Sequence, residues 1–201
     1  MRHPLQFPLT LTFKIVALAP QIYVRDAAGQ EILYVKQKLL KLKEKVRVFE
    51  DSSQARQAYE INADRWLDWS ARYTFTDDQG LTVGSVRRLG ARSLWKATYE
   101  IADASGREVL GIEEENAWVK VLDAVLGEVP ILGIFTGYFL NPKYLVRRTG
   151  TGQEVMRISK HRAFLESRFE VENLGGPLPE GEATPAVLAI LMMVLLERSR
   201  G

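Results

Sequence analysis

Hydrophobic and polar residues alternate along most of this chain, which is the two-residue period of a β-strand. Near the N-terminus, Leu9, Leu11, Phe13 and Ile15 stand at every second position, with polar residues between them. Side chains two residues apart lie on the same face of a strand, so one face of this stretch is expected to be buried. The pattern predicts a strand here and a mainly β protein overall.

Four segments share a further pattern, in which an aromatic residue is followed by alternating apolar positions and then by a glycine. They are "YVRDAAGQEI" from Tyr23, "YTFTDDQGLTV" from Tyr73, "YEIADASGREV" from Tyr99 and "YLVRRTGTGQEV" from Tyr144. In the first three an aspartate precedes the glycine. Its carboxylate can accept local backbone N–H bonds, and glycine tolerates positive φ. Each segment is therefore expected to form a β-hairpin.

Further alternating stretches lie between the hairpins, among them "KVRVFED" from Lys45 and "SRFEVEN" from Ser167. Together these stretches predict roughly ten or more strands. Antiparallel sheets of this size usually close or stack, because exposed edges invite aggregation. A barrel or a sandwich is therefore the expected architecture.

Helical spacing replaces the alternation in "AWVKVLDAVLGEVP", where Trp118, Leu122, Val125 and Val129 recur every three or four residues. Gly127 and Pro130 are typical helix stops. The sequence predicts one extra short helix in this stretch.

The C-terminal stretch "PAVLAILMMVLLERSRG" is apolar without interruption over residues 186–196. The preceding residues 173–184 contain glycines and prolines and predict a loop, after which Thr184 is expected to cap a helix and Pro185 to take its first position. A helix over residues 186–196 is roughly 16 Å long, too short to cross a hydrocarbon core of about 30 Å. Apolar side chains cover all its sides, so it is expected to be surrounded by protein.

Strand number and helix size are compatible with a closed barrel. A barrel of about eight strands is filled by its own side chains, whereas one of about eleven can hold a helix about 10 Å across. We therefore expect one domain, residues 1–201, in which a closed antiparallel barrel encloses the C-terminal helix. The alternative is a helix sandwiched between two sheets.

The amino-acid composition excludes several kinds of site and modification. The 201 residues include no cysteine, which excludes disulfides, thiolate metal sites and palmitoylation. The net charge of +2 is too small to indicate nucleic-acid binding by itself. Lys14 and the nearby prolines argue against a secretory signal peptide, so a cytoplasmic protein is favoured.

The strongest cluster of charge is a run of cations between two expected strands. It consists of Lys36, Lys38, Lys41, Lys43, Lys45 and Arg47. In an extended chain the last four share one face, opposite Leu40, Leu42, Val46 and Val48. Such a face could bind anionic lipid headgroups. The other interpretation is a solvated barrel exterior, where lysines discourage edge pairing.

Catalytic chemistry has little support. The histidines are His3 and His161, and neither has a second metal ligand at helical or turn spacing. Asp77 and Asp78 are explained by the turn at Gly80. We expect no enzymatic activity, metal or cofactor. The pairs Arg87–Arg88 and Arg147–Arg148 are further basic positions whose spatial relation the sequence does not give.

Four segments in order carry a family resemblance: "YVKQKLLKLKEKVRVFED" from Tyr34, "YTFTDDQG" from Tyr73, "GIFTGYFLNPKYLV" from Gly133 and the terminal apolar stretch. Together they resemble the LURP-one-related proteins, within the Tubby C-terminal-like group that also includes the phospholipid scramblases. The resemblance implies a twelve-stranded barrel around a buried C-terminal helix.

The resemblance implies that the protein binds phospholipid. Tubby domains bind phosphoinositide headgroups with basic side chains, and scramblases are associated with phospholipid movement. We therefore expect a non-enzymatic barrel that binds anionic phospholipid peripherally, at a cytoplasmic membrane face, through the cation run. The alternative is a regulatory or protein-interaction module with a protein partner and no lipid role. Scramblase activity is not expected, because the sequence has no cysteine cluster for palmitoylation, no membrane-spanning tail and no acidic loop that matches a calcium site.

Overall fold

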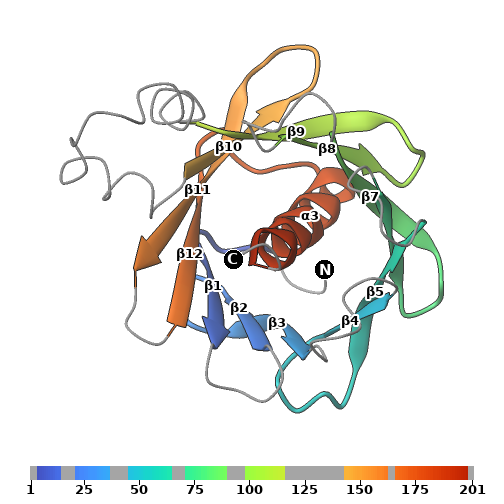
Figure 1. Ribbon diagram of the computed structural model, residues 1–201, viewed down its shortest axis with the longest axis vertical. Coiled ribbons are helices and arrows are strands. Elements are labelled where there is room, and N and C mark those ends of the chain that lie inside the picture. The colour runs from blue at the N-terminus through green and yellow to red at the C-terminus, as the bar shows by residue number, and fades with distance from the viewer. Residues whose placement is uncertain are drawn as a thin grey trace, which may run out of the picture.

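The computed structural model describes residues 4–14, 21–36, 45–64, 71–89, 98–115, 143–162 and 166–198. In this part of the chain, twelve strands form a closed antiparallel barrel, and one helix, α3, runs through its middle (Figure 1). The strands are β1 (Leu9–Lys14), β2 (Gln21–Arg25), β3 (Glu31–Lys36), β4 (Lys45–Phe49), β5 (Gln57–Ala63), β6 (Arg72–Asp77), β7 (Thr82–Arg88), β8 (Thr98–Asp103), β9 (Glu108–Glu114), β10 (Lys143–Arg148), β11 (Glu154–Arg162) and β12 (Glu166–Asn173). The helix α3 spans Glu180–Arg198.

Each strand pairs with its neighbours in the sequence, and β1 closes the ring by pairing with β12. All four predicted hairpins are confirmed, as β2–β3, β6–β7, β8–β9 and β10–β11. The predicted strands at Lys45 and Ser167 are confirmed as β4 and β12. The expected short helix around Trp118 lies outside the described residues.

An aspartate organises the turn in three of these hairpins. In the β6–β7 turn, one carboxylate oxygen of Asp77 accepts hydrogen bonds from the backbone N–H groups of Gln79 and Leu81, at 3.0 and 2.8 Å. Gly80 has a φ of 80°, a conformation that glycine adopts without a Cβ clash. The aspartates of the β2–β3 and β8–β9 turns, Asp26 and Asp103, accept bonds in the same way.

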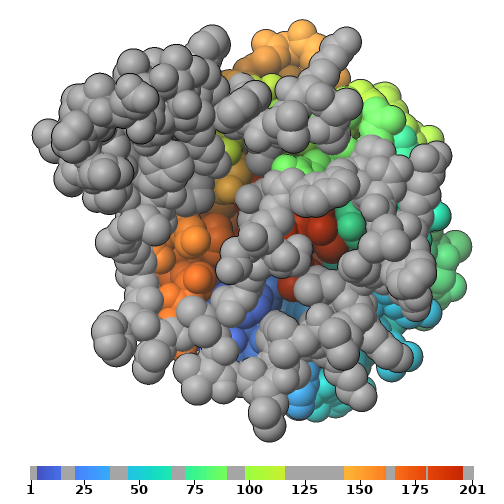
Figure 2. All heavy atoms as spheres, in the orientation of Figure 1, coloured from blue at the N-terminus to red at the C-terminus, as the bar shows by residue number. Residues whose placement is uncertain are grey.

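The core lies between the barrel wall and α3. Every residue of α3 from Ala186 to Leu195 is at most 2% exposed, and inward-facing apolar residues of the strands surround it. In the space-filling view α3 is seen in the middle of the molecule, inside the strands (Figure 2). The predicted barrel around an apolar helix is therefore confirmed, and the two-sheet alternative is wrong. No helix in the described part of the chain is long and apolar enough to span a membrane.

The start of the helix differs from the prediction. The predicted loop ran from residue 173 to residue 184, but the helix begins at Glu180. Residues 180–184 therefore form the start of the helix. The carbonyl of Pro179 accepts bonds from the N–H groups of Glu182 and Ala183, at 2.9 and 3.0 Å. Thr184 is buried and does not cap the helix, and its side chain is hydrogen-bonded to that of Tyr59. Pro185 consequently lies inside the helix.

Pro185 lies against the barrel wall at Gly84 of β7. A Cβ atom at Gly84 would stand 2.7 Å from Cγ of Pro185 and 2.7 Å from the carbonyl oxygen of Ala102. Only glycine leaves room for this approach, which fixes the position of the helix relative to β7 and β8.

Candidate functional site

The pairing of the strands defines two ends of the barrel. Lys14 pairs with Gln21, and Gln21 pairs with Lys36, so these residues lie at one end, which we call the basic end. The turns after β2, β4, β6, β8 and β10 lie at the other, which we call the acidic end. The start of α3 lies toward the acidic end, because Glu182 contacts Arg148 at the end of β10.

Four cations lie together on the outside of the basic end. Lys14, Lys36, Lys45 and Arg47 are all exposed, and we call these four residues the basic patch. Their side chains point outward because the alternate residues, such as Val35 and Val46, are buried.

The patch crosses four adjacent strands. Lys14, Gln21 and Lys36 are paired in one row across β1, β2 and β3. Val35 pairs with Val48, so the antiparallel register brings Lys36 next to Arg47. Neighbouring strands lie about 4.8 Å apart, so a single anionic surface can meet several of these cations.

The structure thus brings together three of the six predicted site residues, namely Lys36, Lys45 and Arg47. Lys38, Lys41 and Lys43 lie outside the described residues. The sequence interpretation missed Lys14, which lies in a different part of the chain. The alternation in β1 indicates that Lys14 points outward, but its place beside Lys36 depends on the β1–β2–β3 pairing.

Described carboxylates offset part of the positive charge of the patch. The Nζ atom of Lys45 lies 2.8 Å from a carboxylate oxygen of Glu60, Arg47 stands opposite the same Glu60 in the β4–β5 pairing, and Lys14 stands opposite Glu166 of β12. Burial alone would raise the pKa of Glu60, but hydrogen bonds from Lys45 and Asn62 outweigh it and lower that pKa. Lys14, Lys36 and Arg47 form no ion pair with another residue in the described ranges.

An aromatic side chain supports one edge of the patch. The Nζ atom of Lys14 lies 4.9 Å from the centre of the Tyr23 ring, and the guanidinium carbon of Arg25 also lies 4.9 Å from it. The Tyr23 ring packs beside Tyr34, with 5.0 Å between their centres. This cation–π contact orients Lys14 without neutralising its charge.

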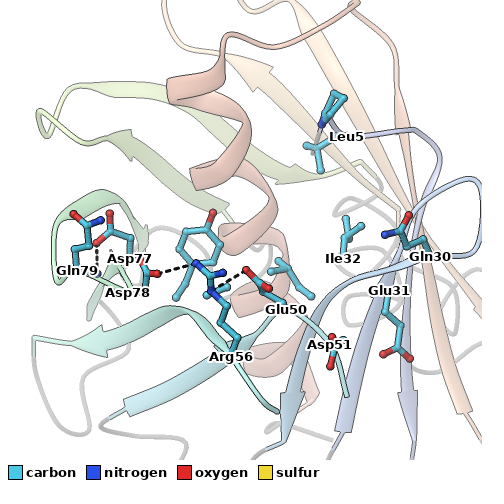
Figure 3. Close-up of a pocket in the computed structure, with 14 residues that line it drawn as sticks. Leu5, Gln30, Glu31, Ile32, Glu50, Asp51, Arg56, Asp77, Asp78 and Gln79 are labelled. Atoms are coloured by element: carbon cyan, nitrogen blue, oxygen red, sulfur yellow. Dashed lines mark hydrogen bonds and ion pairs between the residues drawn. The ribbon is translucent and has the colours of Figure 1, made fainter. Parts of the chain in front are cut away.

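The acidic end contains a cavity of about 480 Å³. It is bordered by the N-terminal segment, by β3 and β5 and by the turns after β4 and β6. Its charged lining residues are five carboxylates and one arginine: Glu31, Glu50, Asp51, Asp77, Asp78 and Arg56. Figure 3 shows Arg56 between Glu50 and Asp78, each at 3.4 Å.

Hydrogen bonds account for other carboxylates of the cavity. Asp51 accepts bonds from the side chain and from the backbone N–H of Ser53, the latter at 2.8 Å, and these bonds lower the pKa of Asp51. Burial alone would raise the pKa of Glu31, but hydrogen bonds from Ser52 and Arg25 outweigh it and lower that pKa. These groups stay ionised at neutral pH, so the cavity repels anionic headgroups. No three carboxylate or histidine side chains of the described residues are placed to hold a metal ion.

The two arginine pairs do not join the basic patch, because they lie on β7 and β10. Arg87 pairs with Glu100, Arg147 with Glu113 and Glu154, and Arg148 with Glu182. Arg88 is buried inside the barrel, with its guanidinium carbon 5.9 Å from the centre of the Tyr99 ring. These arginines bind neighbouring strands and the helix together. His161 is exposed, with its Nε2 atom 3.6 Å from a carboxylate oxygen of Glu170, whereas His3 lies outside the described residues.

Comparison with known proteins gave one family and one solved structure of note. The family model described as LURP-one-related matches residues 31–172, well over half of the chain. The X-ray structure of a protein from Arabidopsis thaliana is similar with a TM-score of 0.49 and 13% sequence identity, over 96% of this chain and 94% of that one. Among curated proteins, none matched.

Proposed function

Since the chain belongs to the LURP-one-related family, we propose that it is a non-enzymatic barrel protein that binds anionic phospholipid peripherally, through the basic patch. The ligand chemistry is the phosphate of a phosphatidylserine or phosphoinositide headgroup at a membrane surface. The proposal places the protein at the cytoplasmic face of a membrane, where anionic lipids give the surface a negative potential.

The observation that carries the proposal is the row of exposed cations at the basic end. Lys14, Lys36 and Arg47 are exposed on β1, β3 and β4 and form no ion pair within the described ranges, although Arg47 stands opposite Glu60 and Lys14 opposite Glu166 in the strand pairing. Each cation near an anionic leaflet contributes about 1 kcal/mol, so three of them contribute at most about 3 kcal/mol. The chain between β3 and β4 adds three lysines in the sequence, Lys38, Lys41 and Lys43. Such binding is weak for each group and depends on salt.

Two further observations support peripheral binding at this place. The cavity at the acidic end has an excess of carboxylates, so it offers no favourable environment for a phosphate. The apolar helix α3 is buried from Ala186 to Leu195 inside the barrel, so its apolar surface is not available to lipid. Attraction of the exposed cations to anionic lipid therefore supplies the binding energy.

Co-sedimentation with vesicles tests the proposal. The protein is mixed at low salt with phosphatidylcholine vesicles, with and without phosphatidylserine or a phosphoinositide. The wild type is expected to sediment only with the anionic vesicles. Lys36→Glu replaces an attractive group by a repulsive one, so it is expected to cost about 2 kcal/mol, or roughly a 30-fold loss of affinity.

Arg107→Glu is the matched control, because it changes the net charge by the same amount at the acidic end. The Arg107 side chain is 75% exposed and pairs only locally, with Asp103. This variant should keep nearly all of the wild-type affinity. Equal losses in the two variants, or no sedimentation of the wild type with any anionic vesicle, would contradict the proposal. In the latter case, a stable protein partner recovered by pull-down would favour a protein-interaction module.

A further inference from the structure

On the β1–β4 side of the barrel the exposed charges of the described residues are largely separated along the barrel axis, although Glu166 of β12 stands opposite Lys14. The basic patch lies at one end. At the other end every arginine in or beside a turn is paired with a carboxylate, as in Arg25–Glu31, Arg56–Glu50 and Arg107–Asp103. Carboxylates remain in excess there, since Asp26, Asp51 and Asp77 form no ion pair within the described part of the chain.

The length of the barrel makes this separation effective. Glu31 and Lys36 begin and end β3, so they are roughly 16 Å apart along the strand at about 3.3 Å per residue. A strand tilt of about 40° leaves roughly 12 Å along the barrel axis. This exceeds the Debye length of about 8 Å at physiological ionic strength. An anionic surface that touches Lys36 is therefore screened from the carboxylates of the other end.

The described outer faces of β7 and β10, away from the patch, offer no comparable cationic surface. On β7 and β10 the outward arginines Arg87 and Arg147 are paired with carboxylates of neighbouring strands. On β11, His161 lies beside Glu170. The exposed Arg168 of β12 stands opposite Thr12 of β1, so it adjoins the patch. Approach to lipid through β7 or β10 would bring paired charges to the surface and would give little attraction.

We infer that the protein meets an anionic membrane with its basic end, on the β1–β4 side, and that the acidic end with its cavity points away from the lipid into solution. This inference rests on the proposed function. The reverse orientation would bring Asp26, Asp51 and Asp77 to the negative surface first and is repelled. The cavity and the start of α3 therefore remain accessible to water-soluble molecules while the protein is bound.

Site-specific labelling tests the orientation, and the absence of cysteine from the sequence makes it direct. Gln21→Cys places a label at the start of β2, at the basic end. Ala28→Cys places one in the turn after β2, at the acidic end of the same hairpin, where Ala28 is exposed. Neither substitution changes the charge. Each variant carries a small fluorophore and is bound to phosphatidylserine vesicles that contain a lipid with a nitroxide quencher on its headgroup.

The label at position 21 is expected to lose most of its fluorescence on binding, whereas the label at position 28 should keep nearly all of it. Equal quenching, or stronger quenching at position 28, with both variants sedimenting normally, would overturn the orientation and leave the proposed function intact. If neither variant nor the wild type sediments with the vesicles, the proposed function fails, and this inference fails with it.

Discussion

At the scale of single residues, Gly84 determines how closely α3 can approach the barrel wall. The ring of Pro185 and the carbonyl of Ala102 occupy the space that a side chain would need. A small residue on a strand and a proline inside a helix are each unfavourable alone, but here they fit together. The sequence predicted neither the contact nor the place of Pro185 inside the helix.

Gly84→Ala is expected to destabilise the protein by about 1–3 kcal/mol, because the added methyl group overpacks the contact between β7 and α3. Urea unfolding measures the loss. Gly111→Ala is the matched control, since a Cβ at Gly111 of β9 would stand 3.6 Å from the Tyr99 carbonyl oxygen, an ordinary contact. If both variants unfold at the same urea concentration as the wild type, the close packing at Gly84 is not important for stability.

The candidate site was predictable only in part, and single residues show why. Lys36, Lys45 and Arg47 stand close together in the sequence, and alternation with Val46 and Val48 places Arg47 on an outer face. Lys14 belongs to the same surface, but strand pairing across β1, β2 and β3 brings it there. Such pairing is not readable from local patterns.

At the scale of elements, turn chemistry made the hairpins predictable. Asp77 and Gly80 define the β6–β7 turn through local hydrogen bonds and backbone conformation, and both signals lie within a few residues. The start of α3 lacked a local signal of this kind. The three glycines and two prolines in residues 173–184 are typical of a loop, but tertiary contacts of the first turn outweigh that preference.

One of these contacts is the pair between Arg148 of β10 and Glu182 of α3. Two oxygens of the Glu182 carboxylate accept bonds from Arg148, at 3.0 and 2.8 Å, and the side chains are 29% and 13% exposed. Partial burial reduces the screening by solvent, so this pair contributes more than a pair on the open surface.

Glu182→Gln is expected to cost about 1 kcal/mol and to speed hydrogen exchange in the first turn of α3 more than in its middle. Hydrogen exchange followed by mass spectrometry measures the difference. Arg107→Gln serves as the comparison, because its pair with Asp103 lies within one exposed turn and should leave α3 unchanged. Unaltered exchange at the start of α3 in the Glu182 variant would show that other contacts hold the helix start.

At the scale of the whole molecule, closure of the barrel pairs the first strand, β1, with the last strand, β12. Leu9 of β1 pairs with Val171 of β12, although a large part of the chain lies between them. The number of strands and the apolar helix favoured a closed barrel over two stacked sheets, because a ring of strands covers all sides of α3. The cavity at the acidic end was not predictable, since four separate segments border it.

The charge separation and the burial of α3 are both properties of the whole molecule. A closed wall keeps the apolar helix away from lipid and water, so that the exposed charges of the two ends determine what the surface attracts. The account therefore depends on α3 remaining enclosed, both in solution and at a membrane.

Hydrogen exchange of the α3 amides over residues 186–195, with and without phosphatidylserine vesicles, tests this claim most directly. The account predicts that these amides exchange only through global unfolding, with an opening free energy equal to that from urea unfolding, and that vesicles do not speed their exchange. Exchange of these amides well before that of the barrel strands, or a marked increase when vesicles are added, would contradict it.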